Sequence, residues 1–495
     1  MDVQFQKTVV PYLQTIVDQT QSQEETQQVR LSDAMPDIGK VLLSWGQVLI
    51  RGKQWRSDSV SLSGGVKTWV LYEPEDGTPP RCVESWLPFQ MKWDLPDTDR
   101  DGTMVACPMT PDVEARMLSD RKLMVRANVS VGMCAMVPAE ALMYMPETMP
   151  EDVQMLKNTY PMLVPVESGE KAFDMEERIS LPAEEQPMET LLRYTLEPML
   201  AESKLVADKL VMRGIARLRM LYMGTDGGLH SWGMELPFSQ YAQLDEQYDP
   251  NAQTQICFGV TGLEMESDSD GAMTLRAGIT GQYTVLDRKE IAVIEDLYST
   301  NRTVKPVFGE LYIPSVLDTQ SQTLRAETSP ENMPAKITDA VFIPGVPQMR
   351  MTEDGRQAEL TGVFRLLGTD MEGNVCATNS RWEDQWTLPV SEDAQVRLVV
   401  EQVELPQYGG SDVWTELRLN ADTVMQQPVK VVIGAELGEI TKQDAQRPSL
   451  ILRRIQDESL WELAKQSGST VEAIQKINGL QQEPVANQML LIPVI

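Results

Sequence analysis

A glycine-led strand occurs three times in this chain of 495 residues, and its copies begin 150 and 148 residues apart. Gly64, Gly214 and Gly362 each precede an apolar stretch that ends in a turn rich in Asp and Gly. Self-similarity at a fixed interval is the sequence signature of repeated structural units. The pattern therefore predicts three domains of one kind, with these glycines at equivalent strand starts.

A second feature keeps the same interval. The triplet Leu-Pro-Phe at 87–89 returns at 236–238, and the third copy has Trp386 where an aromatic residue is expected. Each copy then closes on a strand of alternating type, namely LMVRANVSVGMCAMV, MTLRAGITGQYTVL and WTELRLNADTVM. Alternation with a period of two indicates half-buried antiparallel strands, so we expect a mainly β fold.

The repeats also predict how the chain is divided. The segments between them are rich in Pro and Glu, which is typical of connections or short helices. We expect the first residues to contain a helix that packs on the first domain. The predicted parts are an N-terminal helix or extension (1–29), three repeated β-rich domains (30–145, 178–298 and 323–438), two connectors (146–177 and 299–322), a linker (439–447) and a small βααβ domain (448–495).

The predicted small domain has two short amphipathic helices between two strands. Ser459 and Glu462 have the spacing of a capping box, and so do Ser469 and Glu472. Gly479 is expected to end the second helix. The apolar residues expected to share one face of each helix are Leu460, Leu463 and Ala464, and then Val471, Ile474 and Ile477.

Two family resemblances follow from these stretches. The tail SLWELAKQSGSTVEAIQKINGL, followed by LLIP, resembles a LysM domain over essentially all of 448–495. The segments MPDIGKVLLSWGQVLI, GGVKTWVLYEPEDG and WLPF resemble the SPOCS domain, a β-rich module of sporulation proteins. Several SPOCS modules followed by one LysM are similar to spore-coat morphogenetic proteins. This resemblance implies a scaffold in the mother-cell cytoplasm that binds the coat basement-layer ATPase at the forespore surface.

The LysM resemblance also implies an alternative, because LysM domains bind N-acetylglucosamine chains of peptidoglycan or chitin. Family glycan-binding loops usually show Gly-Asp before the Thr or Ser, and Pro-Gly-Gln before the last strand. This chain has Asp457-Glu458-Ser459 and Ala486-Asn487-Gln488 at those places. Glycine permits the close approach of backbone to a ligand, so its loss weakens the prediction of a glycan-binding protein of the spore cortex or cell wall.

The predicted partner-binding patch centres on the first helix of the tail. Trp461 and Lys465 are one turn apart on the same helix face, and Trp is enriched at the centre of protein interfaces. The alternative is that Trp461 packs against the third repeat or against the strands of its own domain. The full predicted patch is Asp457, Glu458, Ser459, Trp461, Lys465 and Asn478.

Composition excludes several other partners. The formal net charge is −30, so phosphate backbones and anionic lipid surfaces would be repelled, and we expect neither nucleic acid binding nor membrane insertion. The five cysteines show no CxxC spacing and are expected as reduced thiols. Neither a signal peptide nor an apolar run of about 18 residues is visible, which favours a cytoplasmic location.

No catalytic site, metal site or cofactor is predicted. His230 is the only histidine, so a site with two histidine ligands cannot form. Residues 266–271 resemble the start of a calcium-binding loop, but position twelve is Ala277 instead of the required Glu. We therefore expect a hairpin turn there, and we expect that the protein is not an enzyme.

Overall fold

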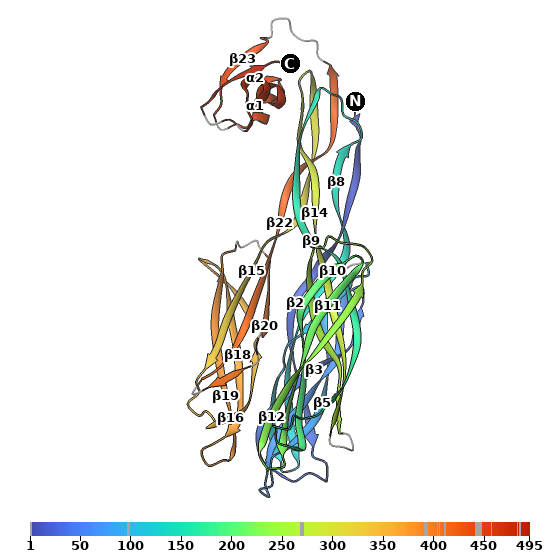
Figure 1. Ribbon diagram of the computed structural model, residues 1–495. Helices are drawn as coiled ribbons and strands as arrows, with labels where there is room; N and C mark the ends of the chain where they lie inside the picture. The colour runs from blue at the N-terminus through green and yellow to red at the C-terminus, as the bar shows by residue number, and fades with distance from the viewer. Residues whose placement is uncertain are drawn as a thin grey trace.

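The prediction of a mainly β fold is confirmed by the computed structural model (Figure 1), which has twenty-four strands and two helices within the described residues. The residues that the structure describes are 2–96, 100–267, 272–390, 395–402, 404, 406–409, 412–440, 448–456, 458–482, 484 and 487–495. The loop expected to form a hairpin turn falls partly outside them, because Asp268, Asp270 and Gly271 are not described.

Three antiparallel sheets are each built around one central strand. They are β3–β4–β5 (Ile38–Trp55, Ser59–Pro74 and Arg81–Asp94), β10–β11–β12 (Met188–Val206, Lys209–Gly224 and Leu229–Gln243) and β16–β18–β19 (Lys336–Pro344, Gly355–Thr369 and Val375–Leu388), with β17 (Gln348–Thr352) also paired to β18. Gly64, Gly214 and Gly362 lie inside the central strands β4, β11 and β18 and not at their starts. Their expected position at strand starts is therefore wrong.

Each of these glycines pairs with an aromatic residue on the neighbouring strand. Gly64 pairs with Phe89, and Gly214 pairs with Phe238. A Cβ atom on Gly214 would lie 2.3 Å from the Phe238 ring, so glycine makes room for that ring. The residue that pairs with Gly362 is Trp382, which is buried, and not the expected Trp386, which pairs with Ala358.

Six long strands pair in twos along almost their whole length. The pairs are β2 with β8 (Phe5–Arg30 and Lys122–Pro146), β9 with β14 (Val153–Ile179 and Met273–Ser299) and β15 with β22 (Arg302–Thr328 and Asp412–Ile440). The helix expected within 1–29 is thus replaced by strand β2. Strands β9 and β15 likewise run through the segments expected to be connectors. Pairing with a distant strand overrides the weak local signal in these polar segments.

Short strands complete the sheets of the long pairs. They are β6 (Thr103–Pro108) and β7 (Asp112–Ser119) on β8, β13 (Gln253–Ser267) on β14, and β20 (Gln395–Gln402), β21 (Gln407–Gly409) and β1 (Asp2–Val3) on β22. We call the stretch of chain from β2 to β8 the first β unit, the stretch from β9 to β14 the second β unit and the stretch from β15 to β22 the third β unit. The units share part of their packing, because Trp45 and Trp69 of the first unit and Leu367 of the third pack into the core of the second.

The outer parts of the long strands extend beyond the sheets as a stalk (Figure 1). Its apolar core takes side chains from all three β units. They include Ala141 and Met143 of the first unit, Met162, Val164, Ile291 and Val293 of the second, and Ile313, Val429 and Val431 of the third. A second cluster of the same kind, which contains Leu297 and Leu437, lies further along these strands. The stalk is therefore a packed structure of three ribbons.

The tail module has the order strand, helix, helix, strand. Its elements are β23 (Leu450–Arg454), α1 (Leu460–Ser467), α2 (Val471–Asn478) and β24 (Met489–Pro493), and β23 pairs with β24 in an antiparallel manner. Among the described residues, no helix has the length and apolar content needed to cross a membrane.

The helix caps of the tail module agree with the sequence in part. Ser459 and Glu462 form the expected capping box, and Gly479 ends α2 with φ +63°. The cap of α2 is Thr470, whose hydroxyl accepts from the Ala473 N–H, and not the expected Ser469. Ile477 was expected in the buried stripe but its side chain is exposed, because α2 turns only Ile474 fully into the core.

Candidate functional site

The centre of the predicted patch contacts the stalk. The indole N–H of Trp461 donates to a carboxylate oxygen of Asp296 in β14 at 2.8 Å. Lys465 Nζ lies 2.8 and 2.6 Å from the two carboxylate oxygens of the same residue. One aspartate of the second β unit thus binds both residues that the sequence placed together. Trp461 also packs against the apolar core of its own module, as one of the sequence alternatives expects, whereas the contact with β14 was not predicted.

Tyr298 strengthens the same contact. Its ring packs edge-on against Trp461 with 4.7 Å between the ring centroids, and its hydroxyl donates to the Ser469 carbonyl at 2.9 Å. Burial, with a smaller contribution from Asp296, raises the pKa of Tyr298 to about 12, so the phenol keeps the proton that it donates. Tyr298 also belongs to the apolar core of the tail module. We call Asp296, Tyr298, Trp461 and Lys465 the latch.

The other predicted residues serve contacts inside the tail module. The Ser459 hydroxyl caps α1, and Glu458 forms an ion pair with Arg453 at 3.0 Å. The side-chain amide of Asn478 donates to the Leu491 carbonyl and accepts from its N–H, which joins α2 to β24. Asp457 lies outside the described residues.

A second surface of the tail module was not predicted. Leu450 and Leu452 of β23 and Met489 of β24 are exposed, and Leu452 has 62% of its area accessible. Leu452 pairs with Leu491, and Arg454 pairs with Met489, so these side chains share the outer face of the two-stranded sheet. Exposed apolar patches mark interaction surfaces. Adjacent apolar residues in LILRR and MLLIP are the sequence signal that could have indicated it.

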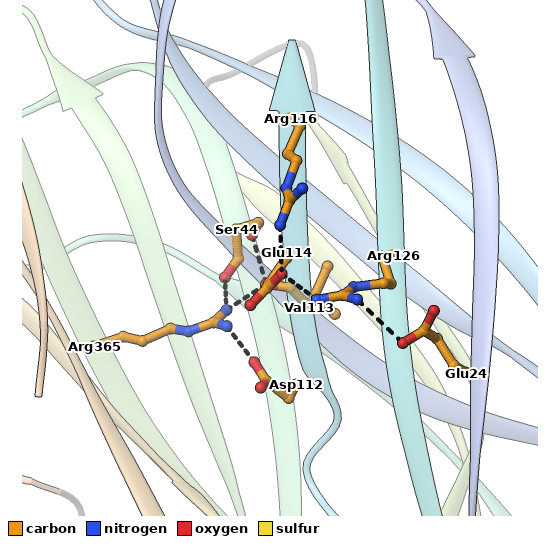
Figure 2. A network of polar contacts seen from close by, with 8 residues as sticks. All are labelled: Glu24, Ser44, Asp112, Val113, Glu114, Arg116, Arg126 and Arg365. Carbon is orange, nitrogen blue, oxygen red and sulfur yellow. Dashed lines mark hydrogen bonds and ion pairs between the residues drawn. The ribbon is translucent and has the colours of Figure 1, made fainter. Parts of the chain in front are cut away.

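Buried cationic side chains connect the β units, and Arg365 of the third unit is the clearest example (Figure 2). Its guanidinium donates to the carbonyls of Ser44 and Val113 at 2.5 and 2.6 Å and forms an ion pair with Asp112, all in the first unit. Only 4% of the Arg365 side chain is exposed. Burial lowers the pKa of Arg365, while Asp112 opposes that effect. Unlike Arg365, Arg116 in the same view is largely exposed.

A buried charge cluster joins the second unit to the third. Asp339 lies 2.9 Å from Arg193 and 2.6 Å from Arg219, and the side chains of Asp339 and Arg193 are each 1% exposed. Arg219 also donates to the Ala340 carbonyl at 3.0 Å. Burial disfavours the Asp339 carboxylate, but the two guanidinium groups outweigh burial and hold its pKa below the ordinary value.

Lys67 joins the first unit to the second. Its ammonium group donates to the Tyr194 hydroxyl at 2.6 Å and to the Leu263 carbonyl at 3.2 Å. Together with Arg219 and Arg365, Lys67 closes a ring in which each unit extends a cation into the next. Lys67 lies three residues after Gly64, and Arg365 lies three residues after Gly362, and this shared spacing is a signal that could have indicated their role.

A cavity of about 260 Å³ lies where the three units meet. Trp45 and Gln47 line it from the first unit, Glu197 from the second and Phe342 from the third. Burial raises the pKa of Glu197, although Arg217 and Arg219 act in the opposite direction. The neutral carboxyl form is therefore favoured more than in water.

The single histidine, His230, lies at the start of strand β12 and pairs with Tyr222 of β11. His230 Nε2 is 3.1 Å from Asp226, and the imidazole stacks on Tyr222 with 5.6 Å between the ring centroids. Within the described part of the chain, no group of three His, Cys, Asp or Glu side chains could hold a metal ion.

Comparisons with protein-family models, curated proteins and solved structures find no match to this chain. The geometry alone therefore defines the class: three interlocked β units with a stalk that carries a docked tail module.

Proposed function

We propose that this protein is a non-enzymatic scaffold whose tail module binds a protein partner. The observation that carries the proposal is the latch, in which Asp296 binds Trp461 and Lys465 and fixes the module to the stalk. The ring formed by Lys67, Arg219 and Arg365 supports it, because hydrogen-bonded cations between the units favour one relative arrangement of the β units. Such an arrangement holds the tail module at a defined distance from the three sheets at the other end of the stalk.

The finer proposal follows the sequence resemblance. The three β units are repeats of one SPOCS-like module, and the tail module is LysM-like. By this resemblance the protein works in the mother-cell cytoplasm at the forespore surface, within the spore coat. Its partner is the coat basement-layer ATPase, and linkage of coat layers is the activity.

In this proposal the partner contacts the predicted patch on the tail module. Asp296 holds Trp461 and Lys465 in one orientation, yet 42% of the Lys465 side chain stays accessible. Fixing side chains before binding reduces the entropy that the complex has to lose. The exposed face with Leu452 is a second surface of the same module and provides a matched control.

The test is the affinity of the full chain for the purified ATPase. We expect Trp461→Ala to weaken binding by about 2 kcal/mol or more, which is the range of interface hot spots. Trp461 has two roles in this proposal, which are docking of the tail module on the stalk and contact with the partner. Asp296→Ala tests these roles separately, because it removes the docking contact and leaves the indole intact. Leu452→Ser should leave the affinity within about twofold, and circular dichroism should show all variants folded.

Other outcomes lead to different conclusions. Normal ATPase binding by folded Trp461→Ala contradicts the predicted patch, and a loss confined to Leu452→Ser assigns binding to the apolar face. If the full chain does not bind the ATPase but sediments with insoluble peptidoglycan, and Trp461→Ala abolishes this, the glycan-binding function replaces the scaffold function.

A further inference from the structure

Three cysteines gather where the first β unit meets the second. Cys134 of β8 lies in an apolar cluster that also contains Cys107 of β6 and Cys257 of β13. Cys107 and Cys257 come from different units and are both partly exposed, whereas Cys134 is buried. All three are free thiols in this structure.

One glutamine places Cys107 and Cys257 beside each other. The side-chain amide of Gln282 accepts from the Ala106 N–H at 2.9 Å and donates to the Ala106 carbonyl at 2.7 Å. Gln282 is the β-ladder partner of Cys257, and Ala106 directly precedes Cys107. Cys257 Sγ lies 4.0 Å from the Ala106 carbonyl oxygen, and both thiols belong to the same apolar cluster. The backbone of Ala106 and the buried side-chain amide of Gln282 therefore hold Cys107 close to Cys257.

The surroundings favour a thiolate on Cys107. The neighbouring Cys257 thiol lowers the pKa of Cys107, against the opposing effect of burial. Arg397 of the third unit acts in the same direction, whereas Asp18 opposes it. Arg397 lies 3.7 Å from Asp18 and donates to Gln255 at 2.8 Å, so its charge is held close to the pair.

The other three thiols lack this activation. Burial raises the pKa of Cys134 to about 12. Burial also raises the pKa of Cys82 and of Cys376. Because the thiolate is the reactive form of cysteine, Cys107 is the favoured nucleophile among the five.

We propose that Cys107 and Cys257 are a redox site, which a low-molecular-weight disulfide converts into a cross-link between the first and second β units. The Cys107 thiolate attacks one sulfur of the small disulfide, a mixed disulfide forms, and one small thiolate leaves. Cys257 then loses its proton to solvent, and its sulfur attacks Cys107 and displaces the second small thiolate. Two protein thiols and one small disulfide thus become one protein disulfide and two small thiols.

The cross-link joins residues 150 positions apart in the chain. Closing a long loop restricts the unfolded chain, so the oxidised protein should unfold at a higher temperature than the reduced one. The first and second β units would then stay joined when the surroundings become oxidising.

The test oxidises the reduced full chain with glutathione disulfide, blocks remaining thiols and maps tryptic peptides. The five cysteines fall on five different tryptic peptides, so each pairing gives a distinct mass; Cys107 lies in 101–116, Cys134 in 127–157 and Cys257 in 220–276. We expect the 101–116 peptide joined to the 220–276 peptide in most molecules, and a reversal with dithiothreitol. Cys107→Ser should abolish this cross-link, and the matched control Cys376→Ser should leave its yield unchanged.

Three results would overturn the proposal. The first is a disulfide between Cys107 and Cys134, and the second is a stable mixed disulfide of Cys107 with glutathione. The third is that the protein thiols stay unmodified under conditions in which glutathione disulfide modifies the thiol of a small unstructured peptide. If Cys107→Ser fails to fold, Cys257→Ser replaces it, since the expected product for that variant is glutathione retained on Cys107.

Discussion

At the residue scale, buried charges decide how the three β units stay together. Lys67, Arg219 and Arg365 each cross from one unit to the next and end on carbonyl or carboxylate oxygens. Lys67 and Arg365 are buried, and the half-buried Arg219 contacts the buried Asp339. A buried cation is costly unless its hydrogen bonds are satisfied, so each contact favours only the arrangement that supplies those oxygens. These residues therefore specify relative position more than they add stability.

Arg365 tests this at one position. Arg365→Met removes the bonds to Ser44, Val113 and Asp112, and we expect the free energy of unfolding to fall by about 3 kcal/mol, as when one member of a buried pair is lost. Denaturant titration of the full chain measures it. Arg116→Met is the control, since the Arg116 side chain is 77% exposed, and it should change stability by less than about 0.5 kcal/mol. Equal effects would contradict the proposed role of Arg365.

Asp339 gives a pH dependence with a definite sign. Its pKa is lowered in the folded protein, so its carboxylate stabilises the fold above the unfolded value and this contribution is lost as the pH falls through the folded value. Asp339→Asn should therefore be markedly less stable than wild type at pH 7. The difference should begin to narrow below about pH 4, where Asp339 of the unfolded chain takes up a proton while the folded carboxylate stays ionised, and it should disappear only below the lowered folded value. Unfolding temperatures of both proteins from pH 7 to pH 3 provide the measurement, and a constant difference would contradict the prediction.

At the element scale, the central strands depend on glycine where an aromatic ring crosses. A Cβ atom at position 214 would lie 2.4 Å from the Met199 carbonyl as well as against Phe238, and backbone cannot move aside cheaply. We expect Gly214→Ala to destabilise the protein by about 2 kcal/mol, as overpacking does. Gly132→Ala is the control, because its nearest contact would be 3.5 Å, and it should be close to neutral. Thermal unfolding of both variants checks this.

The elements predicted well are those with local signals. The tail helices have a capping box at Ser459 and a terminal glycine at Gly479, and both lie within a few residues of the structure that they define. The long strands β2, β9 and β15 were missed because their pairing partners lie far along the chain, as Phe5 with Pro146 shows. Asp296 was missed for the same reason, since Trp461 finds it 165 residues away. Two adjacent acidic residues, Glu295 and Asp296, in the otherwise apolar run IAVIEDLY were the local signal for this site.

At the scale of the whole molecule, the stalk separates the ring of β units from the tail module (Figure 1). Different interactions hold the β units together and hold the tail module on the stalk. The ring uses buried charges between units, whereas the latch uses one partly exposed aspartate with Trp461 and Lys465. Salt screens exposed charges more than buried ones, so the latch should weaken first as ionic strength rises.

This difference leads to a prediction about shape. Asp296→Ala removes the acceptor of the Trp461 N–H and the counter-ion of Lys465, and we expect it to weaken docking by about 2 kcal/mol, as for a hydrogen bond to a charged group. The module should then leave the stalk in a measurable fraction of molecules. Small-angle X-ray scattering should show a larger maximum dimension, and hydrogen exchange should rise for the Trp461 side of α1 while the β units are unchanged.

Tyr298→Phe is the matched control for this experiment. It keeps the ring that packs on Trp461 and loses only the hydrogen bond to the Ser469 carbonyl, so its scattering should stay closer to wild type. Raising the salt concentration should move the wild-type profile toward that of Asp296→Ala and leave the variant itself unchanged, because the variant no longer has the charge pair to screen. A scattering profile of Asp296→Ala identical to wild type at every salt concentration would mean that apolar packing of Tyr298 alone holds the module, and the aspartate would lose its assigned role.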